Sequence, residues 1–535
     1  MTVSDIISTE DIRDWDTEEI VIIQAGTGKG KSYFIKNVLY QYAKERGYKI
    51  LYLVHRRNLL DQFKTELERD NKLDTIDLRT YQSVEAYFIK NAEYTDKQNR
   101  LDLLLNYDYI ICDEFHYFCG DSKFNNQTDI SFKNLFLCKN AIKICMSATP
   151  DEMFQIMAAV AKRYGMRYKK YKIEADYSKM YDLIFYDDKE MHQKILSNVL
   201  DGEKAIVFCD AKEAYNLHLQ FPDSLFLCSS NNTNYYKYVD TDAVSKMLVE
   251  EKFTTKFLFT TTCLDAGVNL RDFAIKTIIV DVGDIGSLIQ CVGRKRIIEN
   301  VAVQGCDDYY NLYIHRHDNK QINGWRTNLQ KKIEEADLFY REPLEHYKKY
   351  GRNDNRNSII YFNKKGEGKI NWLRYYKTQY DINLFTAMID DYEQFGYCRY
   401  LATVFGKSYY DRNGNIKYKY HIENQHTQEL YLKLLEMSGG MRTDTVYMYK
   451  KSDKIPLIQA IGLKDKKGQY VMNREKLNAY LWECGLDYQI QKIRIGNCTA
   501  VWYVKEEAKP KPPAPPKIMT DEEVNSLGLY NIRIV

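Results

Sequence analysis

The sequence predicts an α/β fold built on parallel sheets and divided among several domains. Short apolar runs rich in β-branched residues alternate with stretches of helical spacing, which is typical of strands buried between helices. Polar residues follow directly after several of these runs, at the carboxyl ends where parallel sheets bind ligands. The chain of 535 residues also exceeds what one hydrophobic core usually serves, so we expect more than one domain.

The amino-acid composition limits the classes of protein to which the chain can belong. Hydrophobic residues make up 44% and charged residues 28%, as in an ordinary globular protein, and no long apolar run offers a membrane span. The N-terminus is acidic where a secretory signal would be basic and then apolar, so we expect a cytoplasmic protein without a membrane partner. The 12 cysteines include no CxxC pair and indicate neither zinc nor an iron–sulfur cluster. Because the net charge is only +3, contacts with nucleic acid would have to come from local patches.

The segment AGTGKGKS at 25–32 predicts a phosphate-binding loop. It follows the apolar run 20–23 and precedes apolar residues at helical spacing, the context that such a loop requires. Its glycines let backbone amides turn towards a phosphate at a helix N-terminus. Lys31 would reach the β- and γ-phosphates, and Ser32 would bind Mg²⁺. The first position of the usual motif is Ala25 instead of glycine, and the alternative is a glycine-rich turn with no ligand. The predicted nucleotide-binding residues are Ala25, Gly26, Thr27, Gly28, Lys29, Gly30, Lys31 and Ser32.

Polar motifs also follow the next predicted strands, at 49–54, 107–112 and 141–146. HRR at 55–57 follows the first strand, DEFH at 113–116 the second and SAT at 147–149 the third, while TYQS lies at 80–83. In a P-loop ATPase, the first carboxylate of an acidic pair holds Mg²⁺ and the second orients and deprotonates the attacking water. We therefore expect Asp113 in the first role and Glu114 in the second. Standing alone, DEFH would indicate a helix cap.

A similar pattern recurs later in the chain. The apolar run 204–210 ends in Asp210, the run 257–259 leads into TTTCLDAGVN at 260–269, and the strand 277–280 leads to QCVGRKR at 290–296.

In content and order these motifs resemble those of superfamily 2 helicases of the DExH type. AGTGKGKS is similar to motif I, LVHRRNLL at 53–60 to motif Ia, TYQS to the nucleic-acid contact motif that follows, DEFH to motif II and SAT to motif III. The three later segments resemble motifs IV, V and VI. Asn269 stands where many relatives have aspartate, and Arg296 comes one position early, a spacing similar to herpesvirus-type origin-binding helicases and their phage relatives. The alternative for Arg294 and Arg296 is a solvated basic turn.

The resemblance implies two tandem RecA-like P-loop lobes, at 1–175 and 176–321, whose shared cleft binds ATP and Mg²⁺. The implied catalytic residues are Lys31, Asp113, Glu114, Gln290 and Arg294. Gly267 and Arg296 would join the loop in binding nucleotide, and Ser32 and Asp113 would hold the metal. Arg294 keeps the family's spacing from Gln290 and is expected to contact the γ-phosphate. Arg296 would reach the phosphate only if the local backbone compensates for its shifted position, and would otherwise brace the lobe interface.

Two further sets of residues follow from the resemblance. Coupling of the γ-phosphate to the bound strand is expected from His116, Ser147 and Thr149. Contacts with nucleic acid are expected from Arg56, Tyr81, Gln82, Asp210 and Thr261.

The remaining chain predicts a mixed α+β accessory domain at 322–505 and a proline-rich linker and tail at 506–535. We expect a helix from Ile322, a hairpin of strands 359–362 and 370–376, and helices at 384–405 and 429–437. The helix 474–482 followed by strands 488–495 and 499–504 is typical of a winged-helix-like module. Interleaved tyrosines and lysines could bind single-stranded nucleic acid, but an aromatic-rich helical domain without that role is the alternative.

The function that these motifs indicate is an ATP-dependent helicase or translocase acting on nucleic acid, on DNA rather than RNA and on single-stranded or tailed substrates. One alternative is a nucleic-acid-stimulated ATPase that clamps or remodels without unwinding, as part of a restriction or defence assembly; replication proteins are further candidate partners. A phage packaging ATPase is a second alternative, but it should lack motifs V and VI and carry a nuclease.

Overall fold

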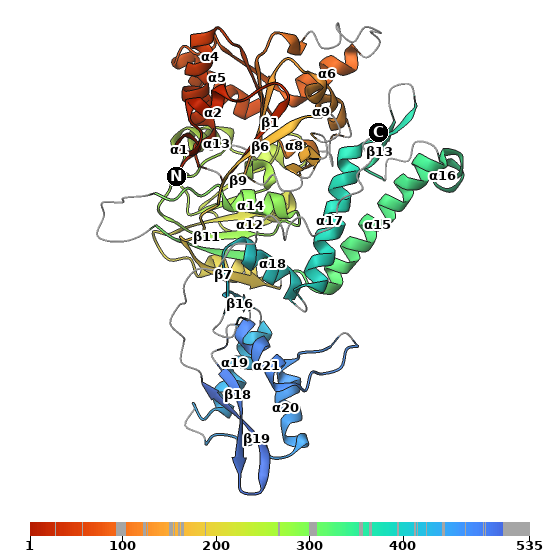
Figure 1. The fold of residues 1–535 in the computed structure, drawn as a ribbon. Coiled ribbons are helices and arrows are strands. Elements are labelled where there is room, and N and C mark those ends of the chain that lie inside the picture. The colour runs from red at the N-terminus through yellow and green to blue at the C-terminus, as the bar shows by residue number, and fades with distance from the viewer. Residues whose placement is uncertain are drawn as a thin grey trace.

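Two parallel sheets, one in each lobe, form the body of the molecule, and a separate module extends from its lower end in Figure 1. The structure is a computed structural model. It describes residues 1–26, 28–55, 57–91, 103–120, 125, 127–148, 153–154, 156–158, 161, 165–187, 189–265, 268–298, 308–351, 357–362, 366–392, 395–410, 414, 416–423, 425–440, 444–465, 467–484, 486 and 488–506. Within these ranges, none of the helices has the length and apolarity that crossing a bilayer requires.

The first lobe contains a six-stranded parallel sheet in the order β3-β2-β4-β5-β1-β6. Its strands are β1 (Glu19–Ala25), β2 (Ile50–Val54), β3 (Ile76–Thr80), β4 (Tyr109–Asp113), β5 (Ile142–Ser147) and β6 (Arg167–Ile173). Its helices are α1 (Val3–Ile6), α2 (Thr9–Arg13), α3 (Lys31–Tyr33), the π-helical η1 (Phe34–Leu39), α4 (Tyr40–Arg46), α5 (Arg57–Arg69), α6 (Tyr81–Lys90), α8 (Tyr117–Gly120) and α9 (Thr128–Leu137). Alternate residues of β1 enter two different cores, with Ile20 and Ile22 on one face and Val21 and Ile23 on the other. The sheet is therefore buried on both faces, as its apolar strands predicted.

The second lobe contains a seven-stranded sheet in the order β17-β7-β12-β11-β8-β10-β9. All its strand pairs are parallel. The strands are β7 (Met180–Tyr186), β8 (Lys204–Phe208), β9 (Ser224–Leu227), β10 (Phe257–Thr260), β11 (Ile275–Val280), β12 (Tyr310–His315) and β17 (His421–Glu423). The helices are α11 (Met191–Ser197), α12 (Ala211–Gln220), α13 (Thr241–Glu250) and α14 (Ile285–Val292), with short 3₁₀ turns η3 (Tyr236–Tyr238) and η4 (Thr262–Asp265). The edge strand β17 lies a hundred residues beyond the boundary expected at 321, so part of the accessory region completes this sheet.

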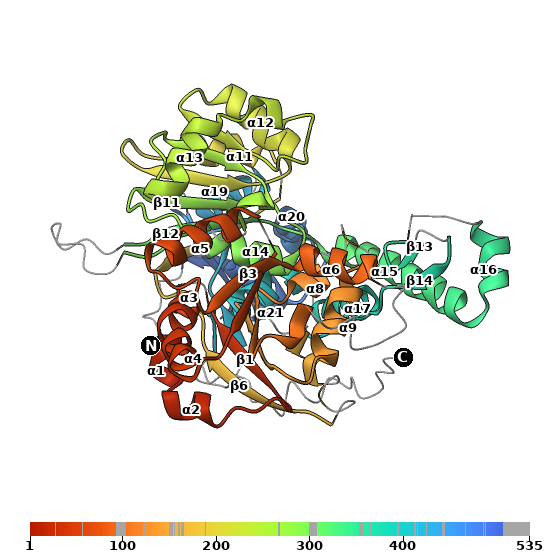
Figure 2. The same cartoon turned by 90° about the horizontal axis from the view of Figure 1, so that it is seen from above.

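Long helices follow the second lobe and project to one side of it (Figure 2). The elements are α15 (Asn319–Arg341), α16 (Pro343–Tyr350), β13 (Ile360–Phe362), β14 (Gly368–Ile370), α17 (Trp372–Asp390), α18 (Gly396–Val404), β15 (Ser408–Tyr410) and β16 (Ile416–Tyr418). In Figure 1, α15 and α17 run side by side.

Two predictions for this region are wrong. The strand expected at 370–376 ends at Ile370, because Asn371 caps α17 by accepting a hydrogen bond from the backbone N–H of Arg374 at 3.1 Å. The single helix expected at 384–405 is broken after Asp390. A new helix begins at Gly396, where a Cβ would lie only 2.0 Å from the carbonyl oxygen of Met388, so the chain approaches α17 too closely for any side chain.

The last described segment, residues 425–506, forms a module with its own core, which includes Leu434, Leu457, Leu477 and Ile490. It consists of α19 (Gln425–Met437), α20 (Lys451–Ile461), α21 (Arg474–Glu483), β18 (Tyr488–Ile495) and β19 (Cys498–Glu506). Met448, between the first two helices, pairs with Trp502 of β19. The helix expected at 474–482 is present as α21, and the strands expected at 488–495 and 499–504 are present as β18 and β19. The proline-rich tail expected at 506–535 lies outside the described residues from 507 onwards.

Candidate nucleotide site between the two lobes

The glycine-rich loop joins the end of β1 to the start of α3, as the sequence predicted. Gly28 and Gly30 have φ values of +82° and +80°, a left-handed conformation that side chains with a Cβ rarely adopt. Lys31 is 8% exposed, and its Nζ donates to the carbonyl oxygen of Ala25 at 2.8 Å. The lysine therefore lies back across the loop and neutralises no carboxylate there by direct contact. A loop with this backbone and an ammonium group at its mouth fits the phosphates of a nucleotide. Thr27 lies outside the described residues.

The acidic pair lies at the end of β4, next to β5. Tyr52 donates from its hydroxyl to Asp113 Oδ2 at 2.6 Å, and the backbone N–H of Glu114 donates to Asp113 Oδ1 at 3.0 Å. Burial, with the adjacent charge of Glu114, raises the pKa of Asp113 to about 6. Glu114 has a φ of +47°, a strained value for a residue with a side chain.

The carboxyl groups of Asp113 and Glu114 differ in the direction of their pKa shifts. Burial alone would raise the pKa of Glu114, but Lys31, His116 and Arg294 outweigh it and lower that pKa below its ordinary value. Asp113, in contrast, has too little positive charge around it to offset burial. The Ser32 hydroxyl interacts with the same Tyr52 hydroxyl that binds Asp113. A partly buried carboxyl whose surrounding positive charge does not offset its desolvation, with a serine hydroxyl nearby, is a donor set that fits Mg²⁺.

A chain of hydrogen bonds crosses from the first lobe to the second. Gln290 of α14 lies 2.7 Å from His116, between Nε2 atoms. The tautomer of the His116 ring decides which of the two groups donates in this hydrogen bond. His116 Nδ1 lies 2.8 Å from Ser147 Oγ, and Ser147 donates to Glu114 Oε2 at 3.2 Å. The four side chains thus connect the acidic pair of the first lobe to the helix that leads to the arginines of the second. Thr149, expected to take part, lies outside the described residues.

The two arginines of the second lobe make different contacts: Arg296 lies over the glycine-rich loop of the first lobe, whereas Arg294 bonds to its own lobe. A Cβ placed on Gly28 would lie 3.1 Å from Arg296 Nη1, so this guanidinium covers the glycine-rich loop. Asn269 holds it there, accepting from Arg296 Nε at 2.7 Å. Burial, with the nearby charge of Arg294, lowers the pKa of Arg296 to about 10. A desolvated guanidinium over a phosphate-binding loop is stabilised when an anion joins it.

Arg294 is 3% exposed and donates from Nε to the carbonyl oxygen of Gln290 at 3.2 Å and from Nη1 to that of Val268 at 3.4 Å. Its charge is felt at Glu114, where it helps to lower the pKa of that carboxyl. The guanidinium over the loop is therefore that of Arg296. The motif spacing favoured Arg294 as the γ-phosphate contact and gave Arg296 either a nucleotide contact or a place at the lobe interface. The shift arises because the backbone of 294–296 is held as a bridge: Leu270 pairs with Lys295. Buried Lys295 is fixed by Asp308 at 2.9 Å. Gly267 lies outside the described residues.

Sequence reasoning missed two residues of this site. Tyr52 belongs to the predicted apolar strand 49–54, and its one polar atom, the hydroxyl, was the only signal in the sequence for its hydrogen bond to Asp113. Asn269 was noted as a departure from the family's aspartate but received no role. As a neutral acceptor it orients Arg296 without neutralising it.

Of the residues expected to contact nucleic acid, one is buried, one caps a helix and two are not buried. The expectation for Tyr81 is wrong, because its exposed fraction is 0%, it stacks on Tyr117 and it donates to the carbonyl oxygen of Asp113 at 2.9 Å. Asp210 caps α12 by accepting from the backbone N–H groups of Lys212 and Glu213, both at 3.0 Å, which explains its position without a nucleic acid. Gln82 and Thr261 are not buried, and Arg56 lies outside the described residues.

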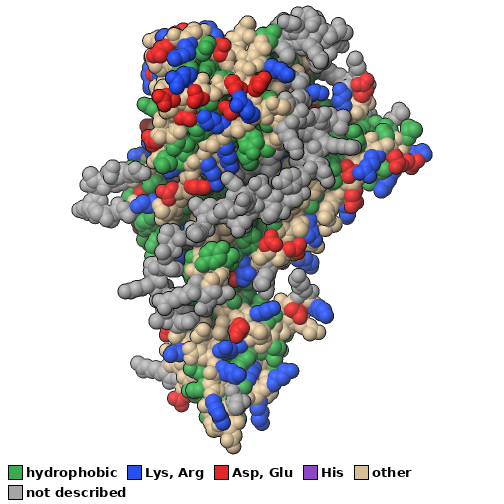
Figure 3. Space-filling model, viewed as in Figure 1, with side chains coloured by type: hydrophobic (Ala, Val, Ile, Leu, Met, Phe, Trp, Pro, Cys, Tyr) green, Lys and Arg blue, Asp and Glu red, His purple; other side chains and the backbone are tan. Residues whose placement is uncertain are grey.

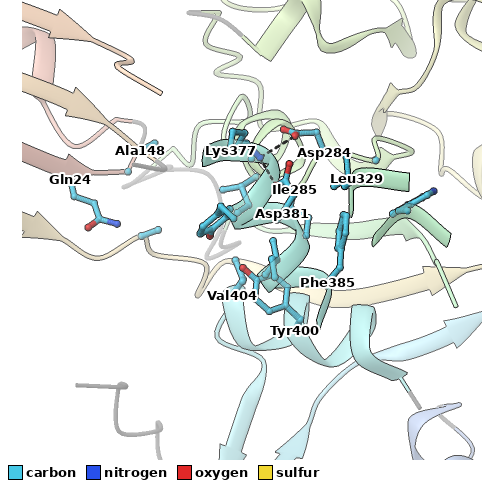
Figure 4. Close-up of a pocket in the computed structure, with 18 of the residues that line it drawn as sticks. Gln24, Ala148, Asp284, Ile285, Leu329, Lys377, Asp381, Phe385, Tyr400 and Val404 are labelled. Atoms are coloured by element: carbon cyan, nitrogen blue, oxygen red, sulfur yellow. Dashed lines mark hydrogen bonds and ion pairs between the residues drawn. The ribbon is translucent and has the colours of Figure 1, made fainter. Parts of the chain in front are cut away.

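A cavity of about 530 Å³ lies beside this site, where both lobes meet the accessory helices (Figure 4). Gln24 and Ala148 line it from the first lobe, Asp284 from the second and Lys377 from α17. Lys377 Nζ lies 2.6 Å from Asp381 Oδ1 and 3.8 Å from Asp284 Oδ1. Asp284 is the residue that caps α14, so α17 contacts the helix that carries Gln290.

Comparison with known proteins supports the resemblance of these motifs to those of superfamily 2 helicases. Residues 3–152 match the family model described as "Type III restriction enzyme, res subunit". This match and the motif order support a superfamily 2 helicase. No curated protein matches the chain.

Several solved structures are similar to parts of the chain. S. cerevisiae Dbp5 bound to RNA and ADP BeF3 has 13% identity and a TM-score of 0.40, covering 56% of this chain and 80% of that chain. A fragment of an HsdR subunit of a type I restriction enzyme from Vibrio vulnificus has 19% identity and a TM-score of 0.35, covering 55% of this chain and 60% of that chain. At these values the likeness defines neither activity nor substrate.

Proposed function

We propose that this protein is an ATP-dependent helicase or translocase of superfamily 2 that acts on nucleic acid, with DNA preferred over RNA. The preference for DNA is inferred from the matched family, whose description is a restriction enzyme subunit. The observation that carries the proposal is the hydrogen-bonded path from Glu114 through Ser147 and His116 to Gln290. It connects the second lobe to the acidic pair through His116 and Ser147, and such a connection is what coupling of hydrolysis to lobe movement requires.

Each residue of the site has a role in this proposal. The backbone amides of the glycine-rich loop and Lys31 bind the β- and γ-phosphates of ATP, and Asp113 with Ser32 holds Mg²⁺, which supplies charge neutralisation at the phosphates. Glu114, the more readily ionised carboxyl, orients the attacking water and accepts its proton. Arg296 contributes positive charge from the opposite lobe as charge develops on the transferred phosphoryl group.

Movement follows from the way the site is divided. The loop and acidic pair belong to the first lobe, while Gln290, Arg294 and Arg296 belong to the second. When hydrolysis removes the γ-phosphate, the anion that holds Arg296 near the loop is lost, and the lobes can separate. Repeated closure and opening would advance a strand bound across both lobes.

The test is ATP turnover measured without nucleic acid and with single-stranded DNA, duplex DNA and RNA as separate stimulants, followed by strand displacement on tailed duplexes. We expect DNA to raise turnover more than RNA and displacement to require ATP. Turnover that responds to no nucleic acid would contradict the proposal.

The matched family also favours a second function, an ATPase that clamps or remodels nucleic acid as a subunit of a restriction or defence assembly. Its signature in the same experiment is stimulation of turnover by DNA without strand displacement on any tailed substrate.

A further inference from the structure

The module of residues 425–506 carries more positive charge than the rest of the chain would suggest. It contains 13 lysine and arginine residues against 9 aspartate and glutamate residues, whereas the whole chain of 535 residues has a net charge of +3. Figure 3 shows these basic side chains on the lower end of the molecule, with fewer acidic ones among them. The excess charge is therefore concentrated in a small, separate unit.

Four exposed cations lie around one end of the hairpin: Lys450, Lys451, Lys492 and Arg494. Lys492 is paired across the hairpin with Trp502, and Trp502 is paired with Met448, two residues before Lys450. A fifth cation, Lys454, connects the two elements: its Nζ lies 4.7 Å from the centre of the Trp502 ring and donates to the carbonyl oxygen of Ala500 at 2.9 Å. These contacts bring the start of α20 and the hairpin to one surface. We call the four exposed cations the basic patch.

One acidic side chain lies beside the basic patch. Asp453 caps α20 by accepting hydrogen bonds from the backbone N–H groups of Tyr449 and Lys450 at 3.1 and 2.8 Å, and its charge also interacts with that of Lys450. One carboxylate beside four cations leaves the patch with a net positive charge. None of the four cations forms an ion pair with another of the described residues. On the lobes, by contrast, exposed lysines and arginines commonly pair, as in Lys172 with Glu174 at 2.7 Å and Arg271 with Glu251 at 2.7 Å. Unpaired like charges held together on a rigid surface repel one another and are relieved by a polyanion.

The module is attached to the rest of the molecule through the C-terminal part of α21. Glu483, at the end of α21, accepts from Arg399 Nε at 3.1 Å and from the Tyr420 hydroxyl at 2.9 Å, and Tyr480 packs against Phe395. These contacts attach α21 to α18 and to the segment before β17. The hairpin projects from the opposite end, as Figure 1 shows.

We propose that the basic patch binds the phosphodiester backbone of the nucleic acid on which the lobes act. The patch consists of positive charges on flexible, exposed stems, which attract phosphate. Such contacts do not depend on the nucleotide sequence. They hold the nucleic acid beside the two lobes during each cycle of lobe opening. The inference assumes the proposed action on nucleic acid but assigns a site that takes no part in ATP hydrolysis.

The test uses the full chain with three charge reversals, Lys451→Glu, Lys492→Glu and Arg494→Glu. Glutamate is favourable at the start of a helix, and the other two side chains are exposed, so the folded module should persist. The control reverses two lysines elsewhere in the module, Lys464→Glu with Lys467→Glu, which lie beyond the other end of α20, about 16 Å along its axis. Binding is measured by fluorescence anisotropy of a labelled 20-base-pair DNA duplex, its single strand and the matching RNA strand, at several salt concentrations, alongside ATP turnover without nucleic acid.

We expect the triple variant to bind at least one of these probes about tenfold or more weakly, with a salt dependence shallower by about three in the slope of log affinity against log salt for duplex. Turnover without nucleic acid should be unchanged in both variants, and the control should bind as the unaltered protein does. Whichever probe is affected shows whether duplex or single strand occupies the patch. Equal affinity of the triple variant for all probes, or an equal loss in the control, would overturn the inference. Failure of the proposed function would appear differently, as turnover in the unaltered protein that no nucleic acid stimulates.

Discussion

The inter-lobe cleft and the C-terminal module use charged side chains in opposite ways. In the cleft, Glu114, His116 and Gln290 are linked to one another through hydrogen bonds, and Arg296 is held by Asn269. In the module, the four cations of the basic patch are exposed and unpaired among the described residues. A site for chemistry needs groups pre-arranged at fixed distances, while a surface for a polymer backbone needs charge that can follow a moving ligand. We therefore expect substitutions in the cleft to change turnover and substitutions in the patch to change affinity.

The largest expected effect is that of Lys31→Ala. The phosphates lose the ammonium group at the mouth of the loop, so we expect ATP binding and hydrolysis to be abolished in calorimetry and turnover assays. Lys29→Ala is the matched control, because Lys29 lies two residues early in the loop and should be largely dispensable. Full activity of Lys31→Ala would contradict the phosphate-binding role of the loop.

Glu114→Gln should separate binding from chemistry. Asp113 and Ser32 remain to hold Mg²⁺, so ATP should still bind, while loss of the base should lower turnover by about 10²- to 10⁴-fold. The trapped ATP complex should also bind nucleic acid more tightly. ATP binding as weak as that of Lys31→Ala would show that the roles assigned within the acidic pair are wrong.

Substitution of each arginine tests which of the two acts on the nucleotide. Arg296→Ala should still bind ATP but lose about 10³-fold in turnover, because its guanidinium lies against Gly28. Arg294→Ala should lose less, since Arg294 contacts backbone carbonyls of its own lobe. Single-turnover hydrolysis would measure both. The opposite order would restore Arg294 as the main γ-phosphate contact, the assignment that motif spacing favoured.

Lys377→Met should have a smaller effect, because Lys377 is outside the nucleotide site and contacts Asp284, the cap of α14, from α17. We expect stimulated turnover to fall about fivefold, the rate equivalent of roughly 1 kcal/mol, with the KM for ATP unchanged. Lys377→Arg keeps the charge and should retain most activity. A change in KM alone would show that α17 affects nucleotide binding instead.

The functional motifs at the strand ends could be predicted because each is encoded in a short segment. Residue positions that depend on contacts between distant segments could not be predicted. The loop at 25–32 and the acidic pair could be identified because their glycines, apolar flanks and spacing are all encoded within a few residues. Arg296 could not be placed over Gly28, because that distance depends on how the two lobes close. Tyr81 looked like a contact for nucleic acid because TYQS matches a motif, but its ring fills the core against Tyr117.

In the accessory region, too, tertiary contacts decided structure that the local sequence did not predict. Residues 371–376 have the aromatic and apolar character of a strand, yet they begin a helix, because packing against the first lobe and α15 overrides local preference. The strand β17 has only three residues and no pattern of its own, so its place at the edge of the second sheet depends on its neighbour β7.

The central claim is that the two lobes communicate through the contact between His116 and Gln290, and a double-mutant cycle tests it most directly. Nucleic-acid-stimulated ATP turnover is measured for His116→Ala, Gln290→Ala and the double variant. If the contact couples the lobes, the second substitution should cost little once the first is made, with a coupling free energy of about 1 kcal/mol or more. Strictly additive losses would contradict the claim, because the two side chains would then act independently across the cleft.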